Sequence, residues 1–236
     1  MDRRKLEITV CCFLWGDWPL AEEYVNNLYK GVECHTNVAF SFICFVDTQN
    51  EYRNHFIDGV ELRHLPERVV KMKRNLTKVY MFSEEAGLSG QVVCFDLDTI
   101  IIGNIDGLLL CRSHHFYSCK CANPRRGNKI DGGVIGFPSP EVVFTNQLWR
   151  PLDLYPIEQK KFSAGSERVY YRIKFREDMD RVRFWEDEYP GQVQSYKWKW
   201  LDEKYDSSDT RVIRFHGYPR PHEIDDVPLL TRWRNP

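Results

Sequence analysis

The first hundred residues alternate between short apolar runs and amphipathic segments, a pattern typical of α/β proteins with a mostly parallel sheet. A helix is expected to start near Asp17 and Pro19, and another to run from Asn75 to Ala86 and end at Gly87. Buried strands are predicted at residues 7–14, 38–46, 60–65 and 91–95. Because strands and helices alternate, we expect an α/β domain with a mostly parallel sheet.

Beyond residue 100 the pattern becomes more mixed. Further strands are predicted at residues 116–121, 134–137 and 211–215, and further helices at residues 140–148 and 166–175. The stretch from Tyr189 to Tyr205 is aromatic and basic without a clear period. No internal repeat, low-complexity segment or linker divides the chain, so we expect one domain over residues 1–236.

Composition excludes several classes of function. The net charge of −1 gives no bulk field to attract nucleic acid or an anionic membrane. No segment approaches the roughly 20 apolar residues of a transmembrane helix, and the N-terminal run lacks a small-residue cleavage site. We therefore expect a soluble, cytoplasmic protein without a transmembrane segment.

The eight cysteines are expected to be reduced, structural thiols. Cys11, Cys12, Cys44 and Cys94 lie inside apolar strand-like runs, where cysteine behaves as a small hydrophobic residue. The pair in Cys119-Lys-Cys121 is spaced too tightly for a zinc ribbon and has no matching second pair.

Two carboxylates, Asp96 and Asp98, follow the strand predicted at residues 91–95. Ligands of parallel sheets bind beyond the carboxyl ends of the strands. Like charges this close repel each other, and a divalent cation with a preference for oxygen ligands, Mg²⁺ or Mn²⁺, relieves the repulsion. The alternative is a strand-end turn whose aspartates cap backbone N–H groups, which is the commoner explanation of an isolated Asp-x-Asp.

The Asp-x-Asp pair is one of several short motifs that occur in a fixed order. They are Leu76-Thr-Lys78, Asp96-Leu-Asp-Thr99, Asn104-Ile-Asp106, Asp131-Gly-Gly-Val134 with Phe137-Pro-Ser139, Gly165-Ser-Glu167, and Phe215-His-Gly-Tyr-Pro-Arg-Pro221. In this order the chain resembles glycogenin and the wider family 8 of retaining glycosyltransferases. The resemblance implies the GT-A fold: a Rossmann-like α/β domain with a mostly parallel central sheet and a mixed C-terminal part.

The resemblance also implies a metal site. Both aspartates of the motif would hold Mn²⁺ (or Mg²⁺) together with a histidine on the late strand, and the metal would bridge the two phosphates of the donor. Asp96 and Asp98 match directly, whereas Arg214 stands where the family has its histidine. Since alternate residues of a strand share a face, His216 could reach the metal from a register shifted by two residues.

Further positions match residues that bind the nucleotide and its phosphates in the family. Lys78 would approach the phosphate and the sugar, and Gly217 and Arg220 would close over the diphosphate. Arginine suits this role because its guanidinium binds phosphate oxygens in pairs. Trp15 or Trp18, in the turn after the first strand, would face the base.

Asp131 and Glu167 match positions that contact the transferred sugar and are the candidate catalytic residues. Here the chain departs from the family, with Asp131 in place of asparagine and Ser166-Glu167 in place of Asp-Gln. The sugar that the family prefers is therefore not implied for this chain. The stretch from Glu186 to Trp200 lines either an acceptor groove or the ordinary core and surface.

The implied activity is transfer of a hexose or pentose from a nucleotide diphosphate sugar, a UDP-sugar, to an unidentified acceptor with retention. Residues 1–110 would form the nucleotide-binding half, and residues 111–236 the sugar and acceptor half with a C-terminal lid. The alternatives are a phosphatase of the haloacid dehalogenase type with Asp96 as nucleophile and Asp98 as acid/base, a nucleotidyltransferase, and a nucleotide-sugar-binding protein without turnover.

Overall fold

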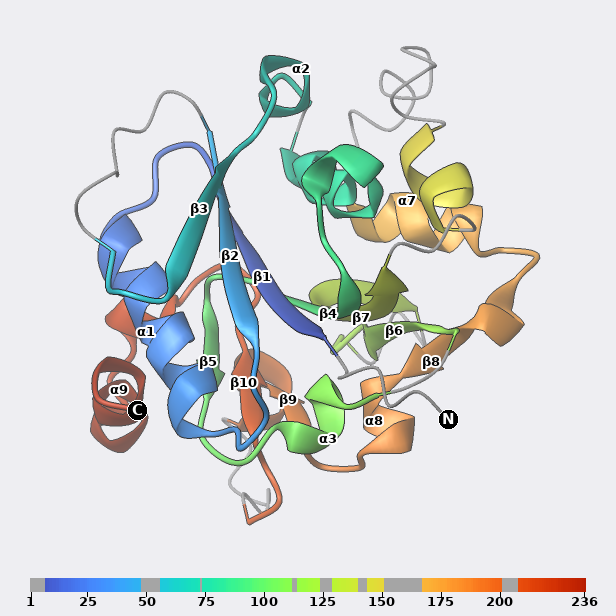
Figure 1. Cartoon of the computed structure of the whole chain (residues 1–236). Helices are drawn as coiled ribbons and strands as arrows, with labels where there is room; N and C mark the ends of the chain where they lie inside the picture. The colour runs from blue at the N-terminus through green and yellow to red at the C-terminus, as the bar shows by residue number, and fades with distance from the viewer. Residues whose placement is uncertain are drawn as a thin grey trace, which may run out of the picture.

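A central seven-stranded sheet with helices on both faces organises the computed structural model (Figure 1). Its strand order is β3-β2-β1-β4-β7-β6-β8, and a smaller sheet has the order β5-β10-β9. The structure describes residues 7–47, 56–72, 74–111, 114–123, 129–139, 144–150, 167–200 and 208–236.

The first four strands are all parallel, as predicted. They are β1 (Ile8–Leu14), β2 (Ser41–Val46), β3 (Val60–His64) and β4 (Gly90–Phe95). Helix α1 (Ala21–Cys34) connects β1 to β2 and begins later than predicted. Leu20 has a φ of 56°, in the left-handed region, so the right-handed helix starts only after it.

The helix predicted from Asn75 to Ala86 is instead a pair of 3₁₀ helices that follow a short α2 (Glu67–Val70). The first, η1, covers Arg74–Phe82, and the second covers Glu84–Ala86. Ser83 separates them because its backbone is extended and its side chain accepts a hydrogen bond from the Ala86 N–H. Gly87 ends the segment as predicted, with a φ of 63°.

The C-terminal half adds β7, β6 and β8 to the large sheet, mostly through antiparallel pairings. Strand β7 runs antiparallel to both β4 and β6, and β6 runs parallel to β8. The bounds are β6 (Phe116–Lys120), β7 (Ile130–Ser139), β8 (Val182–Phe184), α7 (Glu167–Lys174) and α8 (Trp185–Glu188). Of the helix predicted at residues 140–148, the first four residues lie outside the described residues, and Thr145–Trp149 forms a π-helix.

The smaller sheet was not predicted as a unit. It consists of β5 (Thr99–Ile101), β9 (Val193–Ser195) and β10 (Val212–Arg214), and a π-helix at Tyr196–Trp200 follows β9. Strand β10 is antiparallel to β5, with Arg214 opposite Thr99. The late strand is therefore bonded to the segment that directly follows the two aspartates.

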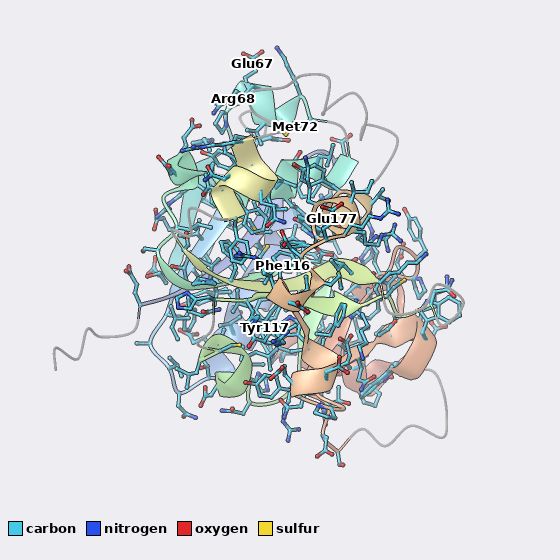
Figure 2. The ribbon with its side chains drawn as sticks, turned by 90° about the vertical axis from the view of Figure 1, so that its right-hand side faces the viewer. Glu67, Arg68, Met72, Phe116, Tyr117 and Glu177 are labelled. Atoms are coloured by element: carbon cyan, nitrogen blue, oxygen red, sulfur yellow. The ribbon has the colours of Figure 1, made fainter. Side chains whose placement is uncertain are left out.

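Two hydrophobic cores lie on opposite faces of the large sheet. The neighbouring residues Phe116 and Tyr117 of β6 point to opposite faces and enter different cores (Figure 2). The Tyr117 core also contains α1 and the C-terminal helix α9 (Val227–Arg234), and the Phe116 core contains η1 and α7. All eight cysteines are free thiols. Within the described residues, no helix is long and apolar enough to cross a membrane.

The loop after α1 is joined to α3 (Asp106–Leu109) through the Asp106 carboxylate. It accepts hydrogen bonds from the Thr36 hydroxyl at 2.6 Å and the Asn37 N–H at 2.9 Å. These bonds, that of Thr36 first, lower the pKa of Asp106 to about 2. Because the folded pKa lies below the unfolded one, this stabilisation is complete above the unfolded value of about 3.9 and is lost as the pH falls toward 2.

We therefore expect Thr36→Val to lower the free energy of unfolding by about 1 kcal/mol at pH 7, because it removes a donor to a charged acceptor. The loss should shrink as Asp106 becomes protonated near pH 2. Urea unfolding at several pH values between 2 and 7 measures both effects. An equal loss across this range would contradict the link to the carboxylate charge.

Candidate functional site

A cavity of about 560 Å³ opens at the carboxyl ends of β1 and β4. Its lining includes eight of the nine site residues predicted from the sequence, namely Trp15, Asp96, Asp98, Asp131, Glu167, His216, Gly217 and Arg220. The ninth, Lys78, contacts two of these residues from beneath the cavity. Segments that are far apart in the sequence thus meet at the edge of the sheet where ligands of α/β folds bind.

The two aspartates of the Asp-x-Asp motif form one wall of this cavity. The Asp96 N–H donates to the Gly133 carbonyl at 3.0 Å, and the Asp96 carbonyl accepts from the Thr99 N–H at 3.1 Å. Leu97 between them is buried, while both carboxylates line the cavity. Burial is the main cause that raises the pKa of Asp96. Burial, and then the charge of Asp96, raise the pKa of Asp98 to about 8.

Lys78 places a fixed positive charge beneath the cavity. Its side chain is only 2% exposed; Nζ contacts the Asp96 carboxylate, donates to the Gly132 carbonyl at 2.9 Å and lies 3.8 Å from Glu167 Oε1. Burial opposes the charge of Lys78, but the charges of Asp96 and then Glu167 outweigh it and raise its pKa. Lys78 therefore remains protonated and is not a solvated helix residue.

Glu167 begins the described part of α7, which packs in the same core as η1, and it lines the cavity. It is 2% exposed, and within the described structure its Oε2 is buried without a hydrogen-bond partner. A Cβ at Gly132 would lie 2.6 Å from Glu167 Oε1, so only glycine leaves room for this carboxylate. Burial raises the pKa of Glu167, and Lys78 offsets this only in part.

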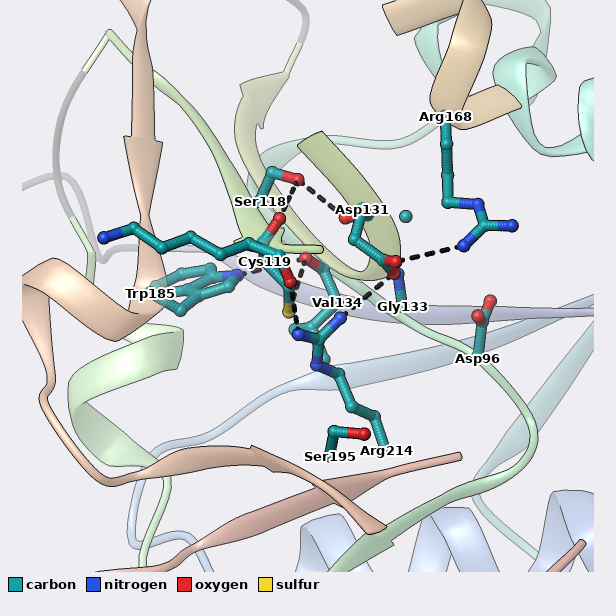
Figure 3. Close-up of polar contacts among 12 residues, drawn as sticks. Asp96, Ser118, Cys119, Asp131, Gly133, Val134, Arg168, Trp185, Ser195 and Arg214 are labelled. Atoms are coloured by element: carbon teal, nitrogen blue, oxygen red, sulfur yellow. Dashed lines mark hydrogen bonds and ion pairs between the residues drawn. The ribbon is translucent and has the colours of Figure 1, made fainter. Parts of the chain in front are cut away.

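Asp131 is held between two arginines (Figure 3). Its Oδ1 lies 3.0 Å from Arg214 Nη1, and its Oδ2 lies 3.2 Å from Arg168 Nη1. Burial alone would raise the pKa of Asp131, but nearby positive charge, Arg214 foremost, lowers it. Asp131 is thus a fixed carboxylate. Arg168 was not singled out from the sequence, because a basic residue in the first turn of a helix carries no signal of its own.

Arg214 and His216 take different places, although the sequence analysis put them on one strand face. Strand β10 ends at Arg214, whose Nη2 also lies 3.1 Å from Glu186 Oε1, so this guanidinium is buried beside the sheet. His216 lies past the strand end and lines the cavity. Its Nε2 is buried with no hydrogen-bond partner among the described residues, and burial, then Arg214, lower its pKa to about 4. The imidazole is therefore neutral at physiological pH.

The segment after β10 closes one side of the cavity with Gly217 and Arg220. Gly217 has a φ of 75°, which favours glycine. The Arg220 guanidinium lies over the rings of Trp18, at 4.3 Å from the centroid, and Tyr218, at 5.5 Å. Because Arg220 covers Trp18, Trp15 is the better placed of the two tryptophans to stack on a planar ligand. The ring of Trp15 lies edge-on to Phe13.

Asp96, Asp98 and His216, the residues predicted to bind a metal, all line this cavity, but they do not surround a single point closely. Among the described residues, no three His, Cys, Asp and Glu side chains lie close enough together to hold a metal ion. Asp96 and Asp98 offer oxygen donors, and the unpartnered Nε2 of His216 offers a nitrogen donor to the same space. Oxygen donors of this kind are the ones that Mn²⁺ and Mg²⁺ prefer.

No protein-family model and no curated protein sequence matches this chain. Similar solved structures are glycosyltransferases. The apo WbbM bifunctional glycosyltransferase matches with a TM-score of 0.65 and 10% identity, over 100% of this chain and 50% of that chain. The galactosyltransferase LgtC, in complex with donor and acceptor sugar analogs, matches with a TM-score of 0.66 and 11% identity, over 96% of this chain and 93% of that chain.

GlyE of Streptococcus pneumoniae TIGR4 also matches, with a TM-score of 0.67 and 11% identity over 98% of this chain and 61% of that chain. The chain thus spans half of WbbM and less than two thirds of GlyE. These likenesses and the strand order confirm the predicted fold class, a mixed α/β domain of the GT-A type.

The buried pair of Arg214 and Asp131 gives a prediction for stability. Arg214→Met removes the buried cation that Asp131 and Glu186 share and leaves Asp131 only with Arg168, and we expect a loss of about 3–5 kcal/mol in the free energy of unfolding. Asp131→Asn in the same chain should recover part of this loss. Arg234→Met breaks an exposed pair with Glu23 and should cost less than about 1 kcal/mol. Urea unfolding of the four proteins tests this order, and similar losses in the two single variants would contradict it.

Proposed function

We propose that this protein is a glycosyltransferase that transfers a sugar from a nucleotide diphosphate donor, a UDP-sugar, to the hydroxyl of an acceptor. One observation carries the proposal: the Asp-x-Asp wall, the Lys78 cation and the Arg220 segment converge on one cavity. This cavity lies at the ligand-binding edge of a fold that the chain shares with glycosyltransferases. LgtC, one of these structures, holds donor and acceptor sugar analogs.

The charge around the cavity suits a diphosphate that arrives with a divalent cation. Among the described residues that line the cavity, four are acidic and two are arginines; they are Asp96, Asp98, Asp131 and Glu167, and Arg168 and Arg220. Lys78 and Arg214 are already engaged by buried acidic partners. The arginines that face the cavity therefore do not by themselves neutralise a bound diphosphate. A divalent metal that enters with it restores the balance.

In this proposal Asp96, Asp98 and His216 would hold Mn²⁺ or Mg²⁺, which would supply electrostatic stabilisation of the leaving diphosphate. Arg220 adds a guanidinium on the open side of the cavity, already oriented by the Trp18 ring. Lys78 holds the Asp96 carboxylate in place. Trp15 stacks on the base.

The sugar of the donor would lie between Glu167 and Asp131, deeper in the same cavity. Asp131 has both oxygens engaged by arginines and so acts as a positioning group. Glu167 has an unpartnered oxygen, which can accept a sugar hydroxyl or stabilise positive charge on the ring. In the proposed same-face mechanism the acceptor oxygen bonds to the anomeric carbon on the side from which the diphosphate leaves, the bond from that carbon to the diphosphate breaks, and the leaving phosphate takes the acceptor proton. Attack on the same face retains the anomeric configuration.

The alternatives read from the sequence fit the structure less well. A phosphatase of the haloacid dehalogenase type would carry its nucleophile after the first strand of its domain, whereas Asp96 follows β4, the fourth strand along the chain. A nucleotidyltransferase needs a basic, glycine-rich loop after β1, and residues 15–19 contain one glycine and no basic residue. A binding protein without turnover remains as an outcome of the experiments below.

The first prediction concerns the metal. Calorimetry of UDP binding should give a much higher affinity with Mn²⁺ than with EDTA, because the metal links the aspartates to the phosphates. Asp98→Asn should abolish this difference, while Glu188→Gln, an acidic residue on α8 outside the cavity lining, should preserve it. Equal UDP affinity with and without metal would contradict the proposed metal site.

The second prediction concerns stereochemistry. Proton NMR during turnover of an α-linked UDP-sugar should show an α-linked product first. The Glu167→Gln variant should keep measurable transfer, because Glu167 orients the sugar and is not an obligatory base, whereas Asp98→Asn should show none. A β-linked first product would refute retention. UDP binding without any turnover would instead support the binding protein.

A further inference from the structure

A second hollow, of about 140 Å³, adjoins the donor cavity. The two spaces share Asp131, Arg168 and His216 as common walls. On its far side the hollow is closed by Asn123, after β6, and by Trp198, in the π-helix that follows β9. It therefore lies beside the part of the cavity assigned to the donor sugar, away from the Trp15 and Trp18 end.

Trp198 is an aromatic side chain that is presented to solvent and yet firmly anchored. It is 40% exposed, whereas the nearby Tyr196 is buried and stacks on Phe215 with ring centroids 4.5 Å apart and an interplanar angle of 13°. The backbone N–H of Trp198 donates to Ser195 Oγ at 3.4 Å. Phe215 directly precedes His216, so the Tyr196–Phe215 stack fixes Trp198 and His216 relative to each other.

The hollow combines one aromatic face with polar groups at its rim. The C–H groups of one face of a pyranose ring are weakly positive and pack on the negative face of an indole. The hydroxyls at the ring edge require hydrogen-bond donors and acceptors, which the Asn123 amide and the Arg168 guanidinium supply. The hollow is far smaller than the donor cavity, so it suits one sugar ring and not a second nucleotide.

We propose that this hollow is the acceptor subsite and that the acceptor is a carbohydrate whose terminal sugar ring stacks on Trp198. This inference rests on the proposed function, because a sugar bound in the hollow would place a hydroxyl next to the donor sugar, at the boundary that Asp131 and His216 form between the two spaces. Arg214 and Arg168 hold Asp131 in place. Asp131 is therefore a fixed part of the wall that both sugars contact. Trp198 determines specificity by selecting rings with one uninterrupted C–H face.

Saturation-transfer NMR tests the proposal with the methyl β-glycosides of glucose, galactose and N-acetylglucosamine as probes, on protein with UDP and Mn²⁺. At least one glycoside should receive saturation at the protons of one ring face. Trp198→Ala should weaken its binding about tenfold through loss of the aromatic contact, and Trp198→Phe should restore most of it. Met179→Ala, which removes another exposed apolar side chain outside the hollow, should change nothing.

UDP affinity, measured by calorimetry on the same samples, separates this proposal from the donor site. Unchanged UDP affinity in Trp198→Ala together with loss of glycoside binding supports the acceptor subsite. If the wild-type protein binds UDP but none of the glycosides, or if Trp198→Ala binds them as well as the wild type, the acceptor subsite is refuted and the donor site stands. Absence of UDP binding in the wild type refutes the proposed function itself.

Discussion

The ammonium group of Lys78 is the point on which the geometry of the cavity depends. A buried charge is tolerated only when partners surround it, and its partners come from the end of β4, from β7 and from α7. Without this cation, the carboxylates of Asp96 and Glu167 would face each other across a buried space. The Lys78 side chain of η1 therefore fixes the position of the Asp-x-Asp wall relative to helix α7.

The remaining charges divide into those that are satisfied within the protein and those left to a ligand. At one wall of the cavity, the buried Arg214 is paired with both Asp131 and the half-buried Glu186. Asp98 also lines the cavity, and the Arg220 guanidinium lies over the rings of Trp18 and Tyr218. This division gives one fixed wall, and it leaves carboxylate and guanidinium groups on the side where the proposed phosphates and metal would bind.

The sequence predicts the parallel N-terminal sheet well because β1, β2 and β4 are apolar runs between turn residues and β3 alternates between apolar and polar residues. The residues singled out by the ordered motifs also meet at one cavity. The sequence could not show the small sheet, because β5 and β9 are only three residues long and depend on pairing with the distant β10. It could not show that Arg214 turns toward Asp131, because that contact depends on how the strand ends.

The pairing of β10 with β5 also has a consequence for the order in which the protein is made. Asp96 and Asp98 leave the ribosome long before His216 and Arg220, which lie beyond the strand that pairs next to them. A nascent or prematurely terminated chain therefore presents the two carboxylates without the imidazole, the guanidinium or the edge strand. In such a fragment the cavity lacks the side that the segment after β10 forms, so a ligand that contacts both sides can bind only to the completed chain.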